Sequence, residues 1–115
     1  MKLRNTAAAA VAAFALVLSL PASALAASGD FHYKFRDADG VEQTSTLHDP
    51  EGGTCINLDA VGSDDIEPGF APYNQTDSWV TVYVGADCDG PEWLLRPNGR
   101  PATDRLLVRS VRFDG

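Results

Sequence analysis

Two short acidic turns hold the residue types best suited to binding a metal ion. Asp37 and Asp39 lie in the first turn, Asp87 and Asp89 lie in the second, and a glycine follows each pair. Carboxylates two residues apart resemble the opening of a calcium loop, since Ca²⁺ takes about six to eight oxygen ligands. The same residues suit a hairpin turn, in which an Asp side chain bonds to its own backbone. The sequence favours the turn, keeps calcium as the alternative and implies no other cofactor.

A histidine and a carboxylate that could activate a nucleophile occur together only as the sequence neighbours His48 and Asp49. Serine and threonine are plentiful, but no nucleophile elbow or other catalytic signature accompanies the pair. A domain of this size also has little room for an enclosed pocket. We therefore expect a protein that is not an enzyme.

The best candidate for a binding site is a long segment without strand character, residues 62–78. It contains Pro68, Phe70, Pro72 and Tyr73. The prolines stiffen the chain, and a stiff loop loses less entropy on binding, which protease inhibitors exploit. The alternative is a crossover between two halves of the fold, with both aromatic rings in the core.

Short runs of aromatic and β-branched residues, separated by Gly, Pro, Asn and Asp clusters, predict an all-β domain. Trp79 and Trp93 fall inside such runs, so we expect both to pack in the core; an exposed, sugar-stacking pair is the alternative. The expected strands are 31–35, 41–47, 54–58, 79–84, 92–95 and 106–113.

The first 26 residues have the pattern of a secretory signal peptide. Lys2 and Arg4 give a positive start, residues 7–20 form an apolar run, and residues 24–26 read Ala-Leu-Ala, a peptidase cleavage pattern. A spanning helix needs about 20 apolar residues, so the run is too short for a membrane anchor. The prediction is a signal peptide over residues 1–26.

Residues 27–115 then form a single secreted domain. Cys55 and Cys88 both lie in this part, and an oxidising compartment would join them in one disulfide. The formal net charge of the whole chain is −7, which excludes the positive footprint of a nucleic-acid-binding protein. No later segment is apolar enough to span a membrane. We expect an extracellular protein as partner, or a polysaccharide.

A pattern of Tyr, six residues and Gly occurs twice, at 33–40 and 83–90, and each copy ends in Asp-x-Asp-Gly. Ser110 follows the second copy in the last expected strand. This pattern resembles the Greek-key motif of the βγ-crystallin superfamily. Residues 80–113 match it best, and residues 31–61 form a weaker first copy.

The resemblance implies a Greek-key β-sandwich of two four-stranded sheets without enzymatic activity. Small secreted bacterial members include metalloproteinase inhibitors and killer-toxin-like proteins. The family's calcium motif is two adjacent Asn/Asp, two variable residues and Ser/Thr-Ser, whereas residues 105–110 here read Arg-Leu-Leu-Val-Arg-Ser. The expected function is a secreted binding module, inhibitor- or toxin-like, acting through residues 68–73. The alternatives are a calcium-stabilised structural domain and a cell-wall or polysaccharide-binding module.

Overall fold

A computed structural model describes residues 26–114, so the predicted signal peptide lies outside the described residues except for its last position. No helix within residues 26–114 is long and apolar enough to cross a membrane. One 3-10 turn, η2 (Ala86–Cys88), accompanies the strands. The strands are β1 (Gly29–Arg36), β2 (Glu42–His48), β3 (Cys55–Asn57), β4 (Gly69–Thr76), β5 (Val80–Tyr83), β6 (Glu92–Leu95), β7 (Leu107–Val108) and β8 (Ser110–Phe113).

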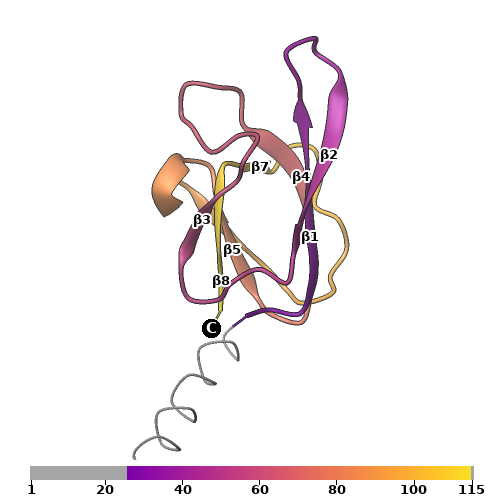
Figure 1. Cartoon of the computed structure of the whole chain (residues 1–115), viewed down its shortest axis with the longest axis vertical. Coiled ribbons are helices and arrows are strands. Elements are labelled where there is room, and N and C mark those ends of the chain that lie inside the picture. Colours follow the sequence, from indigo (N-terminus) through magenta and orange to yellow (C-terminus); the bar gives the residue numbers. More distant parts are fainter. Residues whose placement is uncertain (1–25, 115) are drawn as a thin grey trace, which may run out of the picture.

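The predicted all-β fold is confirmed: the strands form two four-stranded antiparallel sheets (Figure 1). Sheet A has the order β2-β1-β4-β7, and sheet B has the order β3-β8-β5-β6. Each sheet takes three strands from one half of the chain and one strand from the other half. The two halves therefore complete each other's sheets.

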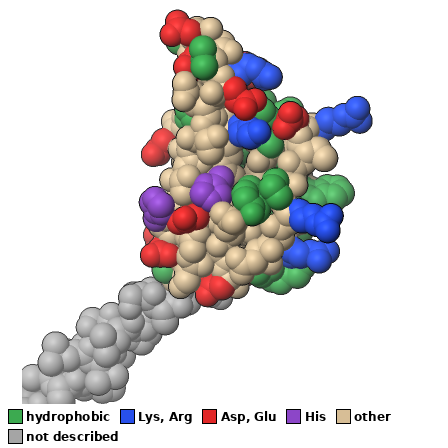
Figure 2. Space-filling model, turned by 90° about the vertical axis from the view of Figure 1, so that its right-hand side faces the viewer, with side chains coloured by type: hydrophobic (Ala, Val, Ile, Leu, Met, Phe, Trp, Pro, Cys, Tyr) green, Lys and Arg blue, Asp and Glu red, His purple; other side chains and the backbone are tan. Residues whose placement is uncertain are grey.

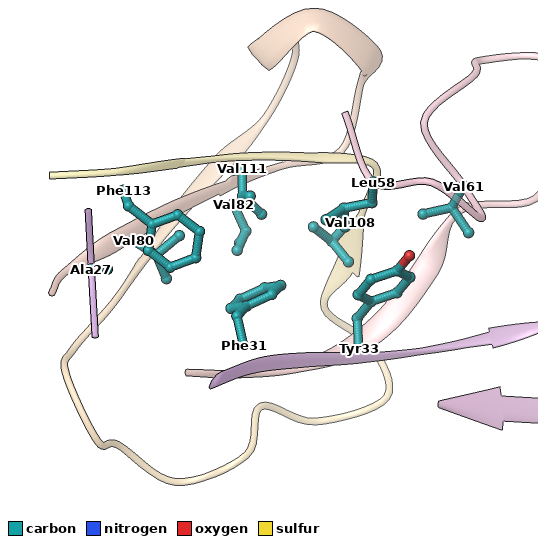
Figure 3. Close-up of a cluster of buried hydrophobic side chains, with 10 residues drawn as sticks. All are labelled: Ala27, Phe31, Tyr33, Leu58, Val61, Val80, Val82, Val108, Val111 and Phe113. Atoms are coloured by element: carbon teal, nitrogen blue, oxygen red, sulfur yellow. The ribbon is translucent and has the colours of Figure 1, made fainter. Parts of the chain in front are cut away.

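The core lies between the inner faces of the two sheets (Figure 3). Phe31 and Tyr33 alternate with outward-facing residues along β1 and point toward the valines of β5 and β8. Phe31 meets Phe113 edge to face, with ring centroids 5.6 Å apart, a favoured aromatic geometry. Ala27, at 1% exposure, closes one end of this core.

The prediction of a structureless segment over residues 62–78 is wrong in its second half, which forms strand β4. This strand lies in the middle of sheet A, between β1 and β7. Pro72 is tolerated there because the pairing with β1 shifts register between His32 and Lys34, and a bulge is where a sheet accepts proline. Ala71 supports the bulge with a positive φ of 51°.

The single strand expected over residues 106–113 is two strands that belong to different sheets. The chain leaves sheet A after β7, passes through Arg109 and enters sheet B as β8. An uninterrupted run of apolar residues does not reveal this crossing. The other expected strands correspond to β1, β2, β3, β5 and β6.

The predicted disulfide is present. Cys55 in β3 and Cys88 in η2 are joined, with their Cα atoms 5.9 Å apart and a sequence separation of 33. The bond therefore fastens the second hairpin turn to the edge of sheet B. It links the two halves of the chain covalently.

The two copies of the Tyr-x6-Gly pattern have glycines with the same backbone conformation, but their tyrosines lie in different surroundings. Gly40 and Gly90 both adopt positive φ, 78° and 81°, as a tight turn requires. Tyr33 is buried in the core, whereas Tyr83 is only partly buried. Because Tyr83 follows the inward-facing Val82, it lies on the outer face of sheet B.

Candidate binding face

The residues expected on a projecting loop lie instead on and beside the central strand β4. Phe70 is only 4% exposed, and Pro72 is fully buried. The expected irregular loop is therefore a strand here, and the alternative that both rings pack in the core is wrong as well, since neither ring belongs to the core cluster. Phe70 and Tyr73 pair with the outward-facing Lys34 and His32 of β1, so both rings lie on the outer face of sheet A.

Figure 2 views the side of the molecule on which β1 and β2 lie in Figure 1. Acidic side chains are spread from the top to the bottom of this side, the histidines lie toward its left, and several Lys and Arg side chains lie along its right border. Both kinds of charge thus occur around hydrophobic groups on the same surface.

A chain of hydrogen bonds crosses the outer face of sheet A through His32. Its Nδ1 lies 2.8 Å from Thr46 Oγ1, and its Nε2 lies 2.8 Å from Gln75 Oε1. Gln75 Nε2 donates in turn to Tyr73 Oη at 2.8 Å. Both ring nitrogens of His32 are thus within hydrogen-bond distance of a side-chain oxygen. The network fixes the Tyr73 ring, which lies against the imidazole at 5.7 Å between centroids.

Beside Tyr73 the outer face is hollowed by about 260 Å³. Ala71 keeps the floor open because its side chain is a single methyl group. The walls combine hydroxyl, ammonium, carboxylate and aromatic groups from β1, β2, β4 and the segment before β7. They include Lys34, Thr44, Tyr73, Pro101 and Asp104.

Arg36 covers the other aromatic ring of this face. Its guanidinium carbon lies 4.9 Å from the centroid of the Phe70 ring, a cation–π arrangement. Arg36 Nη1 is also 3.5 Å from Glu67 Oε1. Tyr73 is therefore the aromatic side chain of β4 that remains open to a ligand.

The first acidic turn uses its own carboxylate to build the hairpin. Asp37 Oδ1 accepts from the backbone N–H groups of Asp39 and Val41, and Oδ2 accepts from Gln43 Nε2. The bond from the Val41 N–H, followed by that from Gln43, lowers the pKa of Asp37 below its usual value. Both oxygens are thus engaged in turn chemistry.

The carboxylates of the second turn are likewise engaged within the fold. Asp87 Oδ1 accepts from Asn57 Nδ2, and Asp89 Oδ1 accepts from the Gly90 N–H. Among residues 26–114 no group of three or more His, Cys, Asp or Glu is arranged to hold a metal ion. The four aspartates therefore do not converge.

Arg109 directly precedes Ser110, between β7 and β8. Its guanidinium donates to three backbone carbonyls, those of Ser63, Val84 and Ile66, at 3.1, 3.0 and 2.6 Å. It also lies 3.9 Å from Asp64. The Arg109 guanidinium therefore occupies the space between these three carbonyl oxygens.

Ser110 binds the second hairpin turn to the last strand. Its Oγ donates to the Gly85 carbonyl at 2.6 Å and accepts from the Cys88 N–H at 2.9 Å. The first half of the chain has Gly69, at the start of β4, packed closely against the core. A Cβ at this position would lie 3.1 Å from the Tyr33 ring. A serine at position 69 would therefore crowd Tyr33, so the first half does not repeat the bonds that Ser110 makes in the second half.

The expectation that both tryptophans pack in the core is wrong. Trp79 is 45% exposed and Trp93 is 62% exposed. Trp93 lies on β6, at the edge of sheet B. Its side chain points to the inner side of this sheet, but sheet A does not extend far enough to cover it. It borders an apolar groove of about 420 Å³ with Leu95 and Leu106.

The predicted histidine–carboxylate neighbours do not form a pair. His48 Nδ1 lies 2.6 Å from Asp30 Oδ1 across the β1–β2 ladder, and His48 is exposed. Asp49 accepts from the Gly29 N–H instead. Alternation along β2 could have indicated that these two side chains diverge.

Comparisons of the chain with protein-family models, with curated proteins and with solved structures each found no match.

Proposed function

We propose that the chain is an extracellular, non-enzymatic binding module of the βγ-crystallin type that binds polysaccharide on the outer face of sheet A. The observation that carries the proposal is the hollow beside Tyr73. There an aromatic ring, held by His32 and Gln75, stands next to hydroxyl, ammonium and carboxylate groups.

The arrangement of strands supports the βγ-crystallin type. The first half supplies β1, β2 and β4 to sheet A and sends β3 to sheet B, and the second half does the reverse. The repeated turn glycines and the Ser110 bonds to the second turn agree with a doubled Greek key.

The surroundings of the histidines support a role without catalysis. Both ring nitrogens of His32 are engaged by side chains, Thr46 and Gln75, that cannot act as a base for it. His48 lies on an exposed surface away from the hollow, paired with Asp30. A disulfide supports an oxidising compartment.

Sugar chemistry fits this face better than the active-site cleft of a protease does. A protease cleft receives a projecting loop, whereas Phe70 and Pro72 are recessed in a central strand. A sugar ring offers an apolar face to Tyr73 and hydroxyl groups to Thr44, Lys34 and Asp104. Orientation by a few polar groups around an aromatic surface is typical of ligand sites.

The proposal is tested by native gel electrophoresis in gels that contain soluble chitin oligomers, xylan or peptidoglycan fragments. We expect retardation of the native protein by at least one of them. Tyr73→Ala should weaken this retardation by about tenfold or more, as for a central aromatic contact. The matched control is Tyr83→Ala on the opposite sheet, which should bind as the native protein does.

Lack of retardation by all three glycans would exclude polysaccharide as the ligand. Binding that survives Tyr73→Ala and fails in Tyr83→Ala would place the site on sheet B. Inhibition of a secreted metalloprotease by the native protein would support the inhibitor-like alternative instead. A melting midpoint that rises with calcium relative to chelator would support the calcium-stabilised alternative.

A further inference from the structure

Four strands form the edges of the two sheets, and β6, four residues between Pro91 and Pro97, is the one whose side chains are mostly apolar and exposed. β3 and β7 have three and two residues, and β3 is tethered by the disulfide. β2 is longer but is mostly polar, with sequence EQTSTLH. Natural sheets protect their edges by short length, charge or proline. The centre of β6, Trp93-Leu94, has neither charge nor proline.

The backbone N–H and C=O groups of Leu94 point away from β5, toward the open edge of sheet B. The Val84 N–H donates to the Pro91 carbonyl at the start of the β5–β6 ladder. In an antiparallel ladder such bonded pairs alternate with non-bonded ones, so Trp93 and Leu95 bond to β5. Glu92 and Leu94 consequently direct their N–H and C=O groups away from the sheet.

The side chains of β6 are equally open. Leu94 is 55% exposed and lies on the outer face of sheet B, opposite Thr81. Trp93 points to the other side, into the apolar groove shared with Leu95 and Leu106. A partner strand along β6 would bury apolar side chains on both of its faces.

We propose that β6 pairs with β6 of a second copy of this chain, so that the two sheets B join in an antiparallel dimer. Its symmetry axis passes through Leu94. This surface is separate from the outer face of sheet A, so the dimer does not depend on the proposed function.

The sequence of β6 is complementary to itself in this register. With Leu94 opposite Leu94 of the second copy, the outward N–H and C=O of each leucine bond to the other. Glu92 then lies directly opposite Arg96 of the second copy, twice per dimer, and directly opposed unlike charges stabilise a strand pair. Trp93 lies opposite Leu95 and covers it.

One residue beyond the strand, the fold also holds the backbone of Arg96. The Arg96 carbonyl accepts from the buried Asn74 Nδ2 at 3.0 Å. The guanidinium of the proposed cross-strand pair therefore extends from a fixed backbone position.

Sedimentation velocity over a range of concentrations tests the proposal with the disulfide-bonded secreted chain. We expect a monomer–dimer equilibrium. Leu94→Lys places two ammonium groups together on the axis and should leave only monomer. The matched control is Val41→Lys, another exposed apolar residue, at the far hairpin; it should dimerise normally. Circular dichroism checks that both variants are folded.

A charge exchange tests the register itself. Glu92→Arg and Arg96→Glu each replace both attractive pairs by repulsive ones, so each variant alone should dimerise about tenfold more weakly. Mixing the two variants restores opposite charges at both positions, so the mixture should form heterodimers of native affinity. Hydrogen exchange at the Leu94 N–H should slow in the dimer.

Two results would overturn the proposal. One is a monomer at every concentration up to the solubility limit. The other is a dimer that Leu94→Lys leaves intact, since it would then use another surface. A dimer sensitive to Leu94→Lys without rescue in the charge-exchange mixture would overturn the Leu94-centred register.

Discussion

At the scale of single residues, Asp37 is an example of a carboxylate engaged entirely by its own turn. Two backbone N–H groups and the Gln43 amide all donate to it. A hydrogen-bonded carboxylate loses its proton more easily, which is why the pKa of Asp37 is lowered in the folded protein. The same contacts that make the turn therefore make it sensitive to acid.

The pH dependence of stability follows from this lowered pKa. The unfolded chain binds a proton at Asp37 at higher pH than the folded chain does, so the contribution is complete above about pH 4. It is lost as the pH falls through the folded pKa. Urea unfolding should show Asp37→Asn less stable than the native protein at pH 7, with the difference shrinking by pH 3. Asp39→Asn in the same turn is the control; an equal difference at both pH values would contradict the assignment.

The position of Ala27 gives a prediction about where the predicted signal peptide would be cleaved. It is 1% exposed within the core, and its N–H donates to the Pro50 carbonyl at 2.8 Å. Cleavage after Ala26 keeps this methyl group and lets the new ammonium group donate in the same place. Cleavage after Ala27 would leave a void in the core. Intact mass spectrometry of the secreted protein should therefore show Ala27 as the first residue, and a first residue of Ser28 would contradict this.

At the scale of elements, Arg109 fastens the segment between β3 and β4 to the last crossover. Its three backbone bonds end on Ser63, Ile66 and Val84. A charged donor satisfies carbonyl groups in a stretch that has no strand to pair with. This explains how an irregular segment keeps one conformation.

Removal of the Arg109 side chain should loosen that segment selectively. We expect Arg109→Ala to lower the free energy of unfolding by about 1–3 kcal/mol, since bonds to a charged group are lost. Hydrogen exchange should accelerate in residues 59–68 more than in β1. Arg105→Ala, which removes an exposed arginine nearby, is the control. Uniform acceleration in every strand would instead indicate a global effect.

The elements that the sequence predicted well are those with clear alternation between turn residues. β1, β5 and β6 have this pattern, and the structure confirms them. β4 could not be recognised because Pro68, Gly69 and Pro72 resemble loop punctuation, while the bulge that accommodates Pro72 depends on pairing with β1. The exposure of Trp93 was missed for a related reason. Strand order decides which strand is an edge, and local sequence does not contain it.

The candidate face was predicted only in part. Tyr73 was expected at the site and lies at the hollow. Its partners His32 and Gln75 come from positions far apart in sequence, and only the sheet brings them together. The stretch of alternating residues in β1 could have indicated that His32 faces outward.

At the scale of the whole molecule, the disulfide joins two halves that already share their sheets. Closing a loop of this length restricts the unfolded chain, so the bond should contribute about 3–4 kcal/mol in the chain-entropy model. We expect Cys55→Ser/Cys88→Ser to keep the same fold and to lower the free energy of unfolding, measured by urea denaturation, by a matching amount. An unchanged midpoint would show that the bond does not restrict the unfolded chain.

The exchange of β3 and β7 between the sheets has a consequence for biosynthesis. β8 is the last strand to be made, yet it lies inside sheet B between β3 and β5. Until β8 leaves the ribosome, β3 has no strand to pair with in sheet B, and only the β5–β6 hairpin of that sheet can form. A nascent chain of this topology cannot complete sheet B, or join the two halves of its core, before the last strand has been synthesised.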